Sequence, residues 1–476
     1  MGRHYDRARW LWVLAALPPA LFVLFFLVLT VLADPQHDDF CFSYRFVEQG
    51  LISIRGFYGE VGGRIVPYGL IDVPAAISQA TGISLLSAYS LTMATGAVAF
   101  LAGCMAAVAR AWPRIRGLPS IFLGLVFAAA VLGASTSVRD LLYWLPGVAC
   151  YVPPGIVCIL ILAECLRALD SKMEFSSAAI VCMAAGGFVA ALCNEFTGIW
   201  LVAILVGSTV ARRMLDQKMQ IGAHALIAIA ITAGWVVVAA ANGNTARMAQ
   251  FADRGHIGHS LLEALRFGMV QFGQFLREPA VIAWLVAVAA LTYAIPDRSE
   301  AAHPRARFLA PGIIVLCLAC CYFEYFVHYY STGIRLVERA QNQALILLLF
   351  GSGLSASLLV RTYRSSLERM IAQSATISSL SSGRLPVALA FLVAALLLLS
   401  KTAFLVYAEG SSLYPYWRET VARHRLLTTT SASVVTVPKH RWTPSLLLSA
   451  DVMVNTGCIA RYFGKTELIV VEPPAD

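Results

Sequence analysis

Long apolar stretches recur from one end of the chain to the other, and they constrain its fold more than any other feature. Crossing a hydrocarbon core of about 30 Å takes roughly 20 apolar helical residues, because each residue rises about 1.5 Å and every backbone polar group must be bonded within the segment. Only 13% of the residues are charged and 59% are hydrophobic, whereas soluble domains carry about a quarter charged residues. The sequence therefore predicts an all-α polytopic membrane protein.

We expect about eleven transmembrane helices, which form a membrane domain over residues 1–406 and leave a small extracytoplasmic tail over residues 407–476. The first stretch is longer than the apolar region of a signal peptide and lacks a clear cleavage site, so we expect a retained anchor. The predicted spans are residues 11–33, 85–109, 118–134, 147–166, 176–193, 197–211, 221–241, 280–295, 308–323, 343–360 and 385–406.

The positions of the arginines predict the orientation of the chain. Cytoplasmic loops of membrane proteins are enriched in Lys and Arg, and with a cytoplasmic N-terminus every inner connection is basic. The residues concerned are Arg110, Arg114, Arg116, Arg167, Lys172, Arg212, Arg213, Lys218, Arg298, Arg305, Arg307, Arg361, Arg364, Arg369 and Arg384. The net charge of +9 then reflects topology, and the scatter of these residues gives no reason to expect nucleic-acid binding.

An odd number of crossings places the C-terminus and the longer connections on the extracytoplasmic side. These connections are residues 34–84, 135–146, 242–279 and 324–342, together with the tail. Residues 260–276 are expected to form an amphipathic helix that lies on the membrane surface. The tail is expected to form a small α/β unit, with helices near residues 416–427 and 455–463 and strands at 434–437 and 468–471. We therefore expect functional residues on the outer face.

Two of the eleven cysteines stand apart from the apolar stretches that hold most of the others. Cys41 lies in the first outer loop and Cys458 lies in the tail, and both segments are expected in an oxidising compartment, where disulfides persist. A disulfide between them would tie the loop to the tail. The sequence leaves open whether the two pair.

The first outer loop, residues 34–84, opens with His37-Asp38-Asp39 within a few residues of the predicted membrane surface. Carboxylates beside hydrocarbon are costly unless they are solvated, paired or bound to a metal. One interpretation is structural, because Asp38 or Asp39 could accept from free N–H groups at the start of a helix. The other is functional: an aspartate could take a proton from an attacking hydroxyl or hold a divalent metal.

Further along the same loop, Gly62-Gly63-Arg64 combines a flexible turn with a fixed cation. A guanidinium binds phosphate oxygens in bidentate fashion, so Arg64 is a candidate phosphate ligand. The alternative is an interfacial arginine that pairs with the Asp38-Asp39 pair or with Glu60.

Three further polar clusters lie at outer ends of predicted spans. Arg139-Asp140 stands beside Tyr143 and Trp144, which are also typical of the aromatic belt at a membrane surface. Asn194-Glu195 occupies a tight turn between two spans, where a carboxylate either caps a helix or has a functional role. The third cluster runs from Glu324 through His328 to Arg339 and Asn342. His328 alone is typical of a structural histidine, whereas Arg339 is well placed to contact an anion.

These residues lie within motifs that resemble a known group of proteins. The motifs are DDFCF (residues 38–42), GGR (62–64), YWLPGVACYVPP (143–154), NEFTG (194–198), ERAQN (338–342) and NTGCIARYFG (455–464). In this order they resemble an uncharacterised bacterial membrane family related to the GT-C class of membrane glycosyltransferases. The resemblance implies a GT-C-like fold with juxtamembrane helices in the first outer loop, in a bacterial inner membrane.

The resemblance also implies a function. A GT-C-like enzyme would move a sugar, with inversion, from a polyprenyl-phosphate-linked donor to an extracytoplasmic cell-envelope acceptor. Asp38 or Asp39 would serve as the base or as ligand to an optional divalent metal such as Mg or Mn. We expect Arg64 and Arg339 to face the donor phosphate and Glu195 to line the acceptor side, with Arg139, His328 and Tyr143 as further substrate-binding candidates. The tail is smaller than the substrate-binding domain of oligosaccharyltransferases, which argues against large protein acceptors.

Two other classes of function remain open on the sequence. A glycolipid transporter or flippase would typically show paired repeats and helices broken at mid-membrane, and the sequence shows neither. A non-catalytic scaffold for envelope assembly is the other alternative if both aspartates are helix caps. The chain has no P-loop, GxSxG or HExxH motif, so ATP-driven pumps and hydrolases of those classes have no support.

Overall fold

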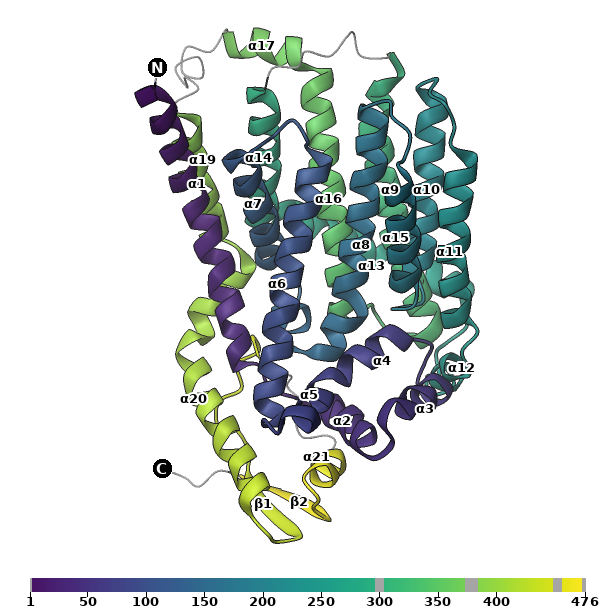
Figure 1. Ribbon diagram of the computed structural model, residues 1–476, viewed down its shortest axis with the longest axis vertical. Helices are drawn as coiled ribbons and strands as arrows, with labels where there is room; N and C mark the ends of the chain where they lie inside the picture. The colour runs from purple at the N-terminus through teal and green to yellow at the C-terminus, as the bar shows by residue number, and fades with distance from the viewer. Residues whose placement is uncertain (1, 296–303, 373–383, 448–455, 473–476) are drawn as a thin grey trace.

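The protein is a bundle of long, roughly parallel and antiparallel helices with a group of short helices at one end (Figure 1). The computed structural model describes residues 2–295, 304–372, 384–447 and 456–472. The N-terminus lies at one end of the bundle, while the short helices and the C-terminal segment lie at the other end (Figure 1). We call the latter the loop end.

The helices occupy most of the chain between short connections. The α-helices are α1 (Gly2–Leu29), α2 (His37–Gln49), α3 (Ser53–Glu60), α4 (Ile65–Ile71), α5 (Val73–Thr81), α6 (Leu85–Ala111), α7 (Leu118–Ala134), α8 (Leu145–Asp170), α9 (Ser177–Ala191), α10 (Thr197–Met214), α11 (Ile221–Ala239), α12 (Asn242–Met248), α13 (Ile257–Arg277), α14 (Pro279–Ala294), α15 (Leu309–Thr332), α16 (Glu338–Thr362), α17 (Arg364–Ala372), α19 (Leu385–Leu398), α20 (Lys401–Thr429) and α21 (Thr456–Tyr462). The 3₁₀ or π segments are Thr30–Leu32, Gly50–Ile52, Arg139–Tyr143 and Pro304–Phe308, and the strands are β1 (Val434–Pro438) and β2 (Glu467–Val471).

Local sequence accounts for several helix starts. Ser84, Ser176 and Ser400 each accept from a backbone N–H in the first turn of α6, α9 and α20, as serine does at an N-cap. Helices α7, α8, α14 and α19 carry proline in the first turn, where its missing N–H costs nothing.

The long apolar helices confirm a multi-pass membrane protein, and they give a lower number of crossings than the apolar pattern does. Among the described residues, seven helices are long and apolar enough to cross a membrane, or nine if each of two bent pairs is one span. Two other expected spans coincide with the shorter apolar helices Leu118–Ala134 and Ser177–Ala191. Eleven crossings therefore stays a prediction.

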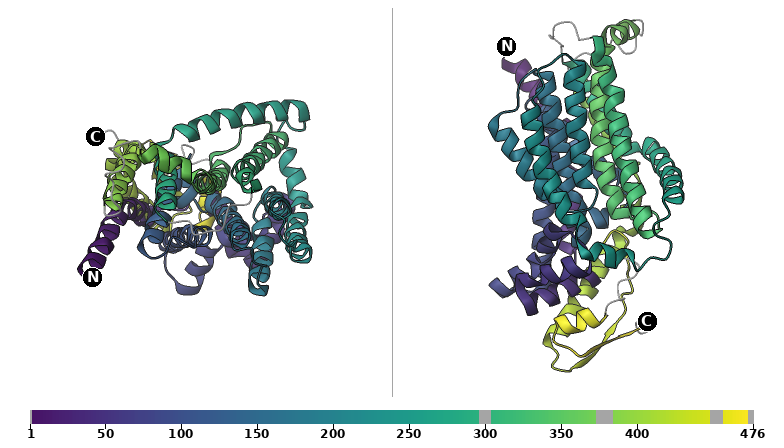
Figure 2. Two further views of the ribbon diagram at one scale, coloured as in Figure 1. Left: turned by 90° about the horizontal axis from the view of Figure 1, so that it is seen from above. Right: turned by 90° about the vertical axis from the view of Figure 1, so that its right-hand side faces the viewer.

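The expectation that no helix is broken is wrong. Helices α13 and α14 meet at a bend of 63°, and α19 and α20 meet at a bend of 59°. The apolar pattern runs through the second bend, so the pattern alone does not reveal it. The first bend falls at Arg277-Glu278, between the expected surface helix and the expected span. Helix α13 covers the expected amphipathic segment and lies along the outside of the bundle (Figure 2).

The end of the bundle that carries the N-terminus gathers the arginines expected in the inner loops. Glu164 pairs with Arg110 and Arg167 at 2.9 and 2.6 Å, and Asp170 pairs with Arg361 at 2.8 Å. These ion pairs join the ends of α6, α8 and α16. By the positive-inside rule this end is expected to be cytoplasmic. Arg298 lies outside the described residues.

The C-terminal segment forms the small α/β unit expected for the tail. Strands β1 and β2 pair in parallel, with Val435 opposite Leu468 and Val437 opposite Val470. Helix α20 is much longer than the predicted helix and carries the chain from the bundle to this unit (Figure 1). Buried apolar side chains of this unit cluster with Phe40 of α2, so the unit docks onto the first outer loop.

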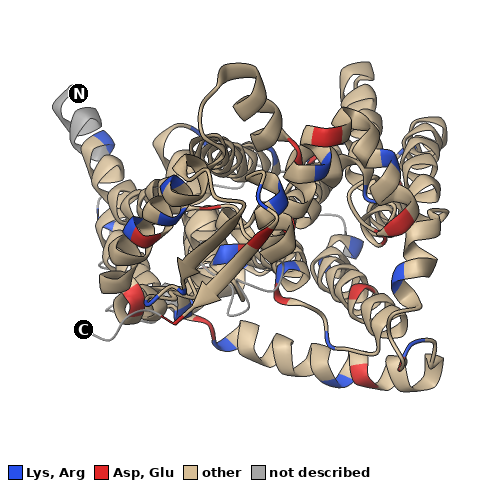
Figure 3. Ribbon diagram, turned by 90° about the horizontal axis from the view of Figure 1, so that it is seen from below, with Lys and Arg blue, Asp and Glu red and all other residues tan. Residues whose placement is uncertain are grey.

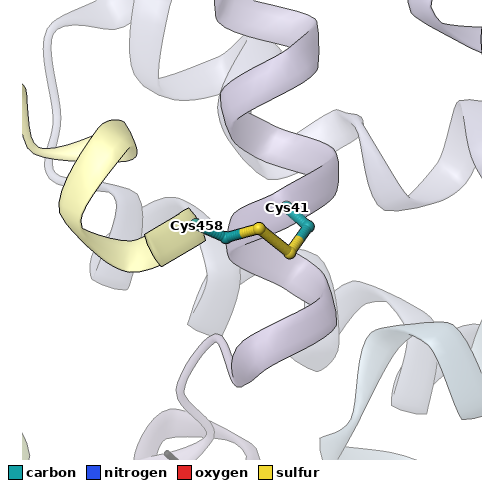
Figure 4. The surroundings of a disulfide bond; sticks show 2 residues. All are labelled: Cys41 and Cys458. Atoms are coloured by element: carbon teal, nitrogen blue, oxygen red, sulfur yellow. A yellow bond between two sulfur atoms is a disulfide. The ribbon is translucent and has the colours of Figure 1, made fainter. Parts of the chain in front are cut away.

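A disulfide joins Cys41 of α2 to Cys458 of α21 (Figure 4). The pairing that the sequence left open is thus formed, across 417 residues of chain. It holds the C-terminal unit on the helix that carries Asp38 and Asp39.

Removing this disulfide should loosen the C-terminal unit. Loss of a native disulfide typically costs about 2–4 kcal/mol, so Cys41→Ser should raise the rate at which a protease cleaves the tail. Cys182→Ser is the matched control, because Cys182 is an exposed free cysteine. Gel electrophoresis measures the cleavage of the tail over time. Equal cleavage rates in the two variants would contradict the prediction.

Candidate functional site

Arg64 and Glu195 form a bidentate ion pair at the loop end of the bundle. Arg64 Nε donates to Glu195 Oε1 at 3.0 Å and Arg64 Nη2 donates to Oε2 at 2.9 Å. The two side chains are 13% and 26% exposed, so the pair is largely screened from water yet accessible. The sequence had offered the Asp38-Asp39 pair or Glu60 as partners of Arg64, but Glu60 pairs with Arg45 at 2.8 Å.

The glycines before Arg64 are required by close packing. A Cβ on Gly63 would collide with the backbone of Val238 at the end of α11, and a Cβ on Gly243 would collide with the backbone at Gly62. Asn244 bridges the two segments, because its Oδ1 accepts from Gly63 N at 3.3 Å and its Nδ2 donates to Val238 O at 2.7 Å. This packing fixes the backbone from which the Arg64 side chain extends.

Three more charged or titratable side chains lie within electrostatic range of the Arg64–Glu195 pair. Arg247 of α12 interacts electrostatically with Arg64, Glu195 and Arg339. His328 of α15 interacts electrostatically with Arg64, Glu195, Arg247 and Arg339. We call Arg64, Glu195, Arg247, His328 and Arg339 the arginine site. Figure 3 views the molecule from the loop end, where acidic and basic residues from several elements gather.

Helix α8 forms the floor of this site. The Tyr151 hydroxyl lies 3.4 Å from Arg64 Nη1, and the Arg64 guanidinium lies 5.8 Å from the centre of the Tyr151 ring. The thiol of Cys150 lies 3.9 Å from the same Nη1. Both side chains are buried, so the inner side of Arg64 contacts protein rather than water.

The charges of the site do not balance, since three guanidiniums surround one carboxylate. The positive charge of Arg64, followed by burial, lowers the pKa of Arg247. Burial raises the pKa of Glu195, but the charge and hydrogen bonds of Arg64 more than offset this and lower it overall. Glu195 is therefore ionised at neutral pH. The site carries an excess of positive charge, which an anion would relieve.

Four of the predicted residues meet in the arginine site: Arg64, Glu195, His328 and Arg339. They come from segments more than 250 residues apart in the sequence. Arg247 was not singled out, because it is one of several arginines in residues 242–279 and nothing local distinguishes it. Its role depends on Gly243, whose close packing brings α12 against the first outer loop.

Buried amides hold the motifs NEFTG and ERAQN together beside the site. Asn194 Nδ2 donates to Gln343 Oε1 at 2.9 Å, and Gln343 Nε2 donates to the Thr197 hydroxyl at 2.8 Å. Asn194 Oδ1 accepts from Thr197 N at 3.0 Å and so caps α10. These bonds tie the turn that carries Glu195 to the helix that carries Arg339. Asn194, rather than Glu195, is thus the helix cap in this turn.

Arg139 and Tyr143 lie beside the site but have other partners. Arg139 pairs with Asp140 at 2.7 Å, and both Arg139 and Arg339 stack on the ring of Trp144, at 5.8 and 5.1 Å from its centre. Tyr143 is fully buried and donates to Phe26 O at 2.9 Å. Tyr143 therefore packs in the core and does not reach the arginine site. Trp144 is buried as well, so it is not a membrane-surface belt residue.

The two aspartates of α2 have different environments. Asp39 is 2% exposed, and its Oδ2 accepts from Gln36 N at 2.9 Å and from the Tyr89 hydroxyl at 3.1 Å. It thereby belongs to the capping box of α2, which is the structural alternative raised by the sequence. Burial raises the pKa of Asp39 well above its usual range. Asp38 is half-buried, and no hydrogen bond to its side chain is formed among the described residues.

A divalent metal at this point would be held by Asp38 and Asp39. The Oδ1 atom of Asp39 is buried and has no hydrogen-bond partner within the described part of the chain, so it is available as a ligand. No group of three or more His, Cys, Asp or Glu side chains suited to a metal occurs among the described residues. Mg²⁺ commonly uses one or two carboxylates plus phosphate and water, which the pair could provide with a substrate.

A third buried aspartate, Asp34, links the end of the first span to α20. Its Oδ1 accepts from the Tyr416 hydroxyl at 2.6 Å, and the side chain is 5% exposed. Burial raises the pKa of Asp34 to about 7, although the bond from Tyr416 lowers it in part. The folded protein therefore binds this proton more tightly than the unfolded chain does.

This shift predicts a specific dependence of stability on pH. Because the folded pKa exceeds the unfolded one, Asp34 contributes roughly 4 kcal/mol to the free energy of unfolding below about pH 4. This contribution is lost as the pH rises to about 7. Asp34→Asn cannot ionise, so it should raise the thermal unfolding temperature relative to wild type at pH 8 and not at pH 4. The exposed Asp253 gives the control Asp253→Asn. The same difference between Asp34→Asn and wild type at both pH values would refute the assignment.

The fold and the site together define a multi-pass helical membrane protein with a cationic site at the loop end of its bundle. Comparisons with protein-family models, with curated proteins and with solved structures find no match to this chain. The functional argument therefore rests on the site itself and on the resemblance of its motifs.

Proposed function

We propose that the protein is a membrane glycosyltransferase that moves a sugar from a polyprenyl-phosphate-linked donor to an extracytoplasmic cell-envelope acceptor, with inversion. The observation that carries this proposal is the meeting of three guanidiniums with a single carboxylate at the end of an apolar bundle. A phosphate diester bears one negative charge and oxygens that match a guanidinium. Its lipid chain would lie along the apolar outer surface of the helices.

Arg64, Arg247 and Arg339 would hold the donor phosphate. Arg64 is already oriented by Glu195, so little side-chain freedom is lost when a ligand binds. Arg339 is held against Trp144. The charge of the phosphate would then lower the mutual repulsion of the three guanidiniums, which favours a bound anion over an empty site.

For the transfer reaction, the protein mainly has to position the donor and the acceptor and to stabilise the charge that develops. The acceptor oxygen forms a bond to the anomeric carbon while the bond from that carbon to the phosphate oxygen breaks, and the electron pair leaves with the phosphate. Arginines around the phosphate stabilise the charge that develops on it. We propose Asp38 as the base that takes the hydroxyl proton, because Asp39 is engaged in capping α2. A metal bound by the pair would add further charge stabilisation.

A glycolipid transporter is the second candidate, and the two bent helix pairs favour it. Discontinuous helices are common in transporters, where they lie near the substrate site at mid-membrane. The arginine site, however, uses α8, α12, α15, α16, the segment before α4 and the turn before α10, and none of these belongs to a bent pair. The site residues therefore favour an enzyme over a transporter.

The proposal is tested with purified protein in lipid vesicles. A polyprenyl-phosphate sugar carrying a radioactive label is the donor, and transfer to an envelope glycan acceptor is measured. We expect transfer by the wild type and none by Asp38→Asn at equal protein level. Labelled donor that crosses the vesicle membrane without forming a new glycosidic bond would identify a transporter and overturn the proposal.

Binding can be measured separately from transfer. Arg247→Gln should weaken the binding of polyprenyl phosphate at least tenfold, since one charge-assisted contact to phosphate is lost. Arg55→Gln is the matched control, because Arg55 is an exposed arginine of the same outer region. Equal affinity of the two variants in native mass spectrometry would contradict the role of Arg247.

A further inference from the structure

Glu324 is a carboxyl group buried inside the bundle without a partner. Its side chain is 0% exposed, and neither carboxyl oxygen has a hydrogen bond within the described part of the chain. The groups that interact electrostatically with it include the thiols of Cys158, Cys320 and Cys321 and the phenol of Tyr325. An ionised carboxylate in such surroundings would be very costly. Glu324 therefore carries a proton in the resting protein.

His328 lies one helical turn from Glu324 toward the loop end. Residues four apart share a face of a helix, with their Cβ atoms about 5–6 Å apart. The Nε2 atom of His328 is also buried and without a partner in the described chain. His328 in turn lies in the field of Arg64, Arg247 and Arg339. Two unsatisfied polar groups thus lead from the membrane interior to the arginine site.

Helix α8 follows the same path from the other side. Cys150 contacts Arg64 at the arginine site, and Cys158, two turns further along α8, neighbours Glu324. Helix α8 therefore carries one side chain that contacts Arg64 and another that interacts electrostatically with Glu324. Buried polar groups without partners are rare in native proteins and commonly mark functional positions.

We propose that Glu324 and His328 form a proton path that delivers a proton to the phosphate leaving group at the arginine site. This inference rests on the proposed function and extends it, since it assigns the acid that complements Asp38 as base. His328 is the catalytic residue that touches the phosphate, and Glu324 supplies the proton through it.

The protons and electrons of the step balance. As the bond between the anomeric carbon and the phosphate oxygen breaks, its electron pair goes to that oxygen. One imidazole nitrogen of His328 gives its proton to the oxygen, and the other nitrogen takes the proton of Glu324. Asp38 meanwhile holds the proton of the acceptor hydroxyl and releases it to solvent. Glu324 then regains a proton through His328 after the lipid phosphate leaves.

Infrared spectroscopy tests whether the Glu324 carboxyl group is protonated in the resting protein, and it requires no activity assay. The difference spectrum between the wild type and Glu324→Gln should show the loss of one protonated carboxyl absorption, while the buried acids Asp34 and Asp39, whose pKa values are raised by burial, contribute equally to both spectra. Glu164→Gln is the matched control, because Glu164 is also buried in a long helix but pairs with Arg110 and Arg167. That variant should lose a carboxylate absorption instead. A difference spectrum in which Glu324→Gln loses no protonated carboxyl absorption would overturn the inference.

Transfer kinetics test the role of the path. General acid catalysis contributes roughly 10²–10⁴-fold, so Glu324→Gln and His328→Gln should each lower kcat at least 100-fold and leave KM for the donor within about threefold. Glu324→Asp should recover part of kcat. Unchanged kcat in Glu324→Gln would refute the path while leaving the proposed function intact. A wild type that binds polyprenyl phosphate but transfers no sugar would instead refute the proposed function.

Discussion

Replacing Arg64 with glutamine should weaken the binding of polyprenyl phosphate at least 100-fold and also destabilise the protein. Affinity falls because the variant loses the guanidinium charge and the Nη–H donors that Glu195 does not use. Stability falls because Glu195 keeps its charge in a largely buried position without its partner, at a cost of about 3 kcal/mol. Native mass spectrometry measures the binding, and the thermal unfolding temperature measures the stability.

The double variant Arg64→Gln with Glu195→Gln separates these two effects. Removing the orphaned carboxylate should restore most of the unfolding temperature, because no buried charge is left unpaired. Binding of the lipid phosphate should stay weak, since the guanidinium is still missing. If the double variant recovers binding together with stability, Arg64 acts only through the fold and does not contact the phosphate.

Replacing Gly63 with alanine should displace Arg64 and destabilise the protein. The new Cβ would collide with the backbone of Val238, which cannot move aside as a flexible side chain could. The first outer loop must then shift away from α11, at a cost of roughly 3 kcal/mol. Arg64 follows Gly63 directly, so its guanidinium would move away from Glu195. We expect a lower unfolding temperature and binding of polyprenyl phosphate reduced at least tenfold.

Gly59→Ala is the control for this prediction. Gly59 lies in α3 of the same loop, and a Cβ at this position meets no atom within 4 Å. Alanine also favours a helix over glycine by about 1 kcal/mol, so this variant should be as stable as the wild type or more so. A Gly63→Ala variant that matches Gly59→Ala in stability and binding would show that the close packing at Gly63 is not needed.

The helical bundle could be predicted from the sequence because every span must be apolar and long enough to cross the hydrocarbon core of the membrane. Ten of the eleven predicted stretches lie mainly on a single observed helix, and residues 385–406 run from α19 into α20, since apolar length decides where a span is predicted. The bend between α19 and α20 was missed for the same reason, because residues 385–406 were predicted as one span and their apolar content continues across the bend. The bend between α13 and α14 instead falls at Arg277-Glu278, between the predicted surface helix and the predicted span.

The arginine site could be predicted in part. Arg64 was recognisable because it follows a Gly-Gly turn in the first outer loop, and Arg339 because it stands at the head of a predicted span on the outer side. Arg247 was missed because its place depends on the contact of Gly243 with the first outer loop. The structural role of Asp39 could not be told from a catalytic one either, since a carboxylate at the start of a helix suits both. That distinction needed the bonds to Gln36 and Tyr89.

The most direct test of the central claim is an experimental structure of the protein with bound polyprenyl phosphate. The account predicts density for the phosphate within hydrogen-bonding distance of Arg64, Arg247 and Arg339, with the lipid chain along the outside of the bundle. Density for the phosphate at another position, with the Arg64–Glu195 pair unchanged and no ligand beside it, would contradict the account.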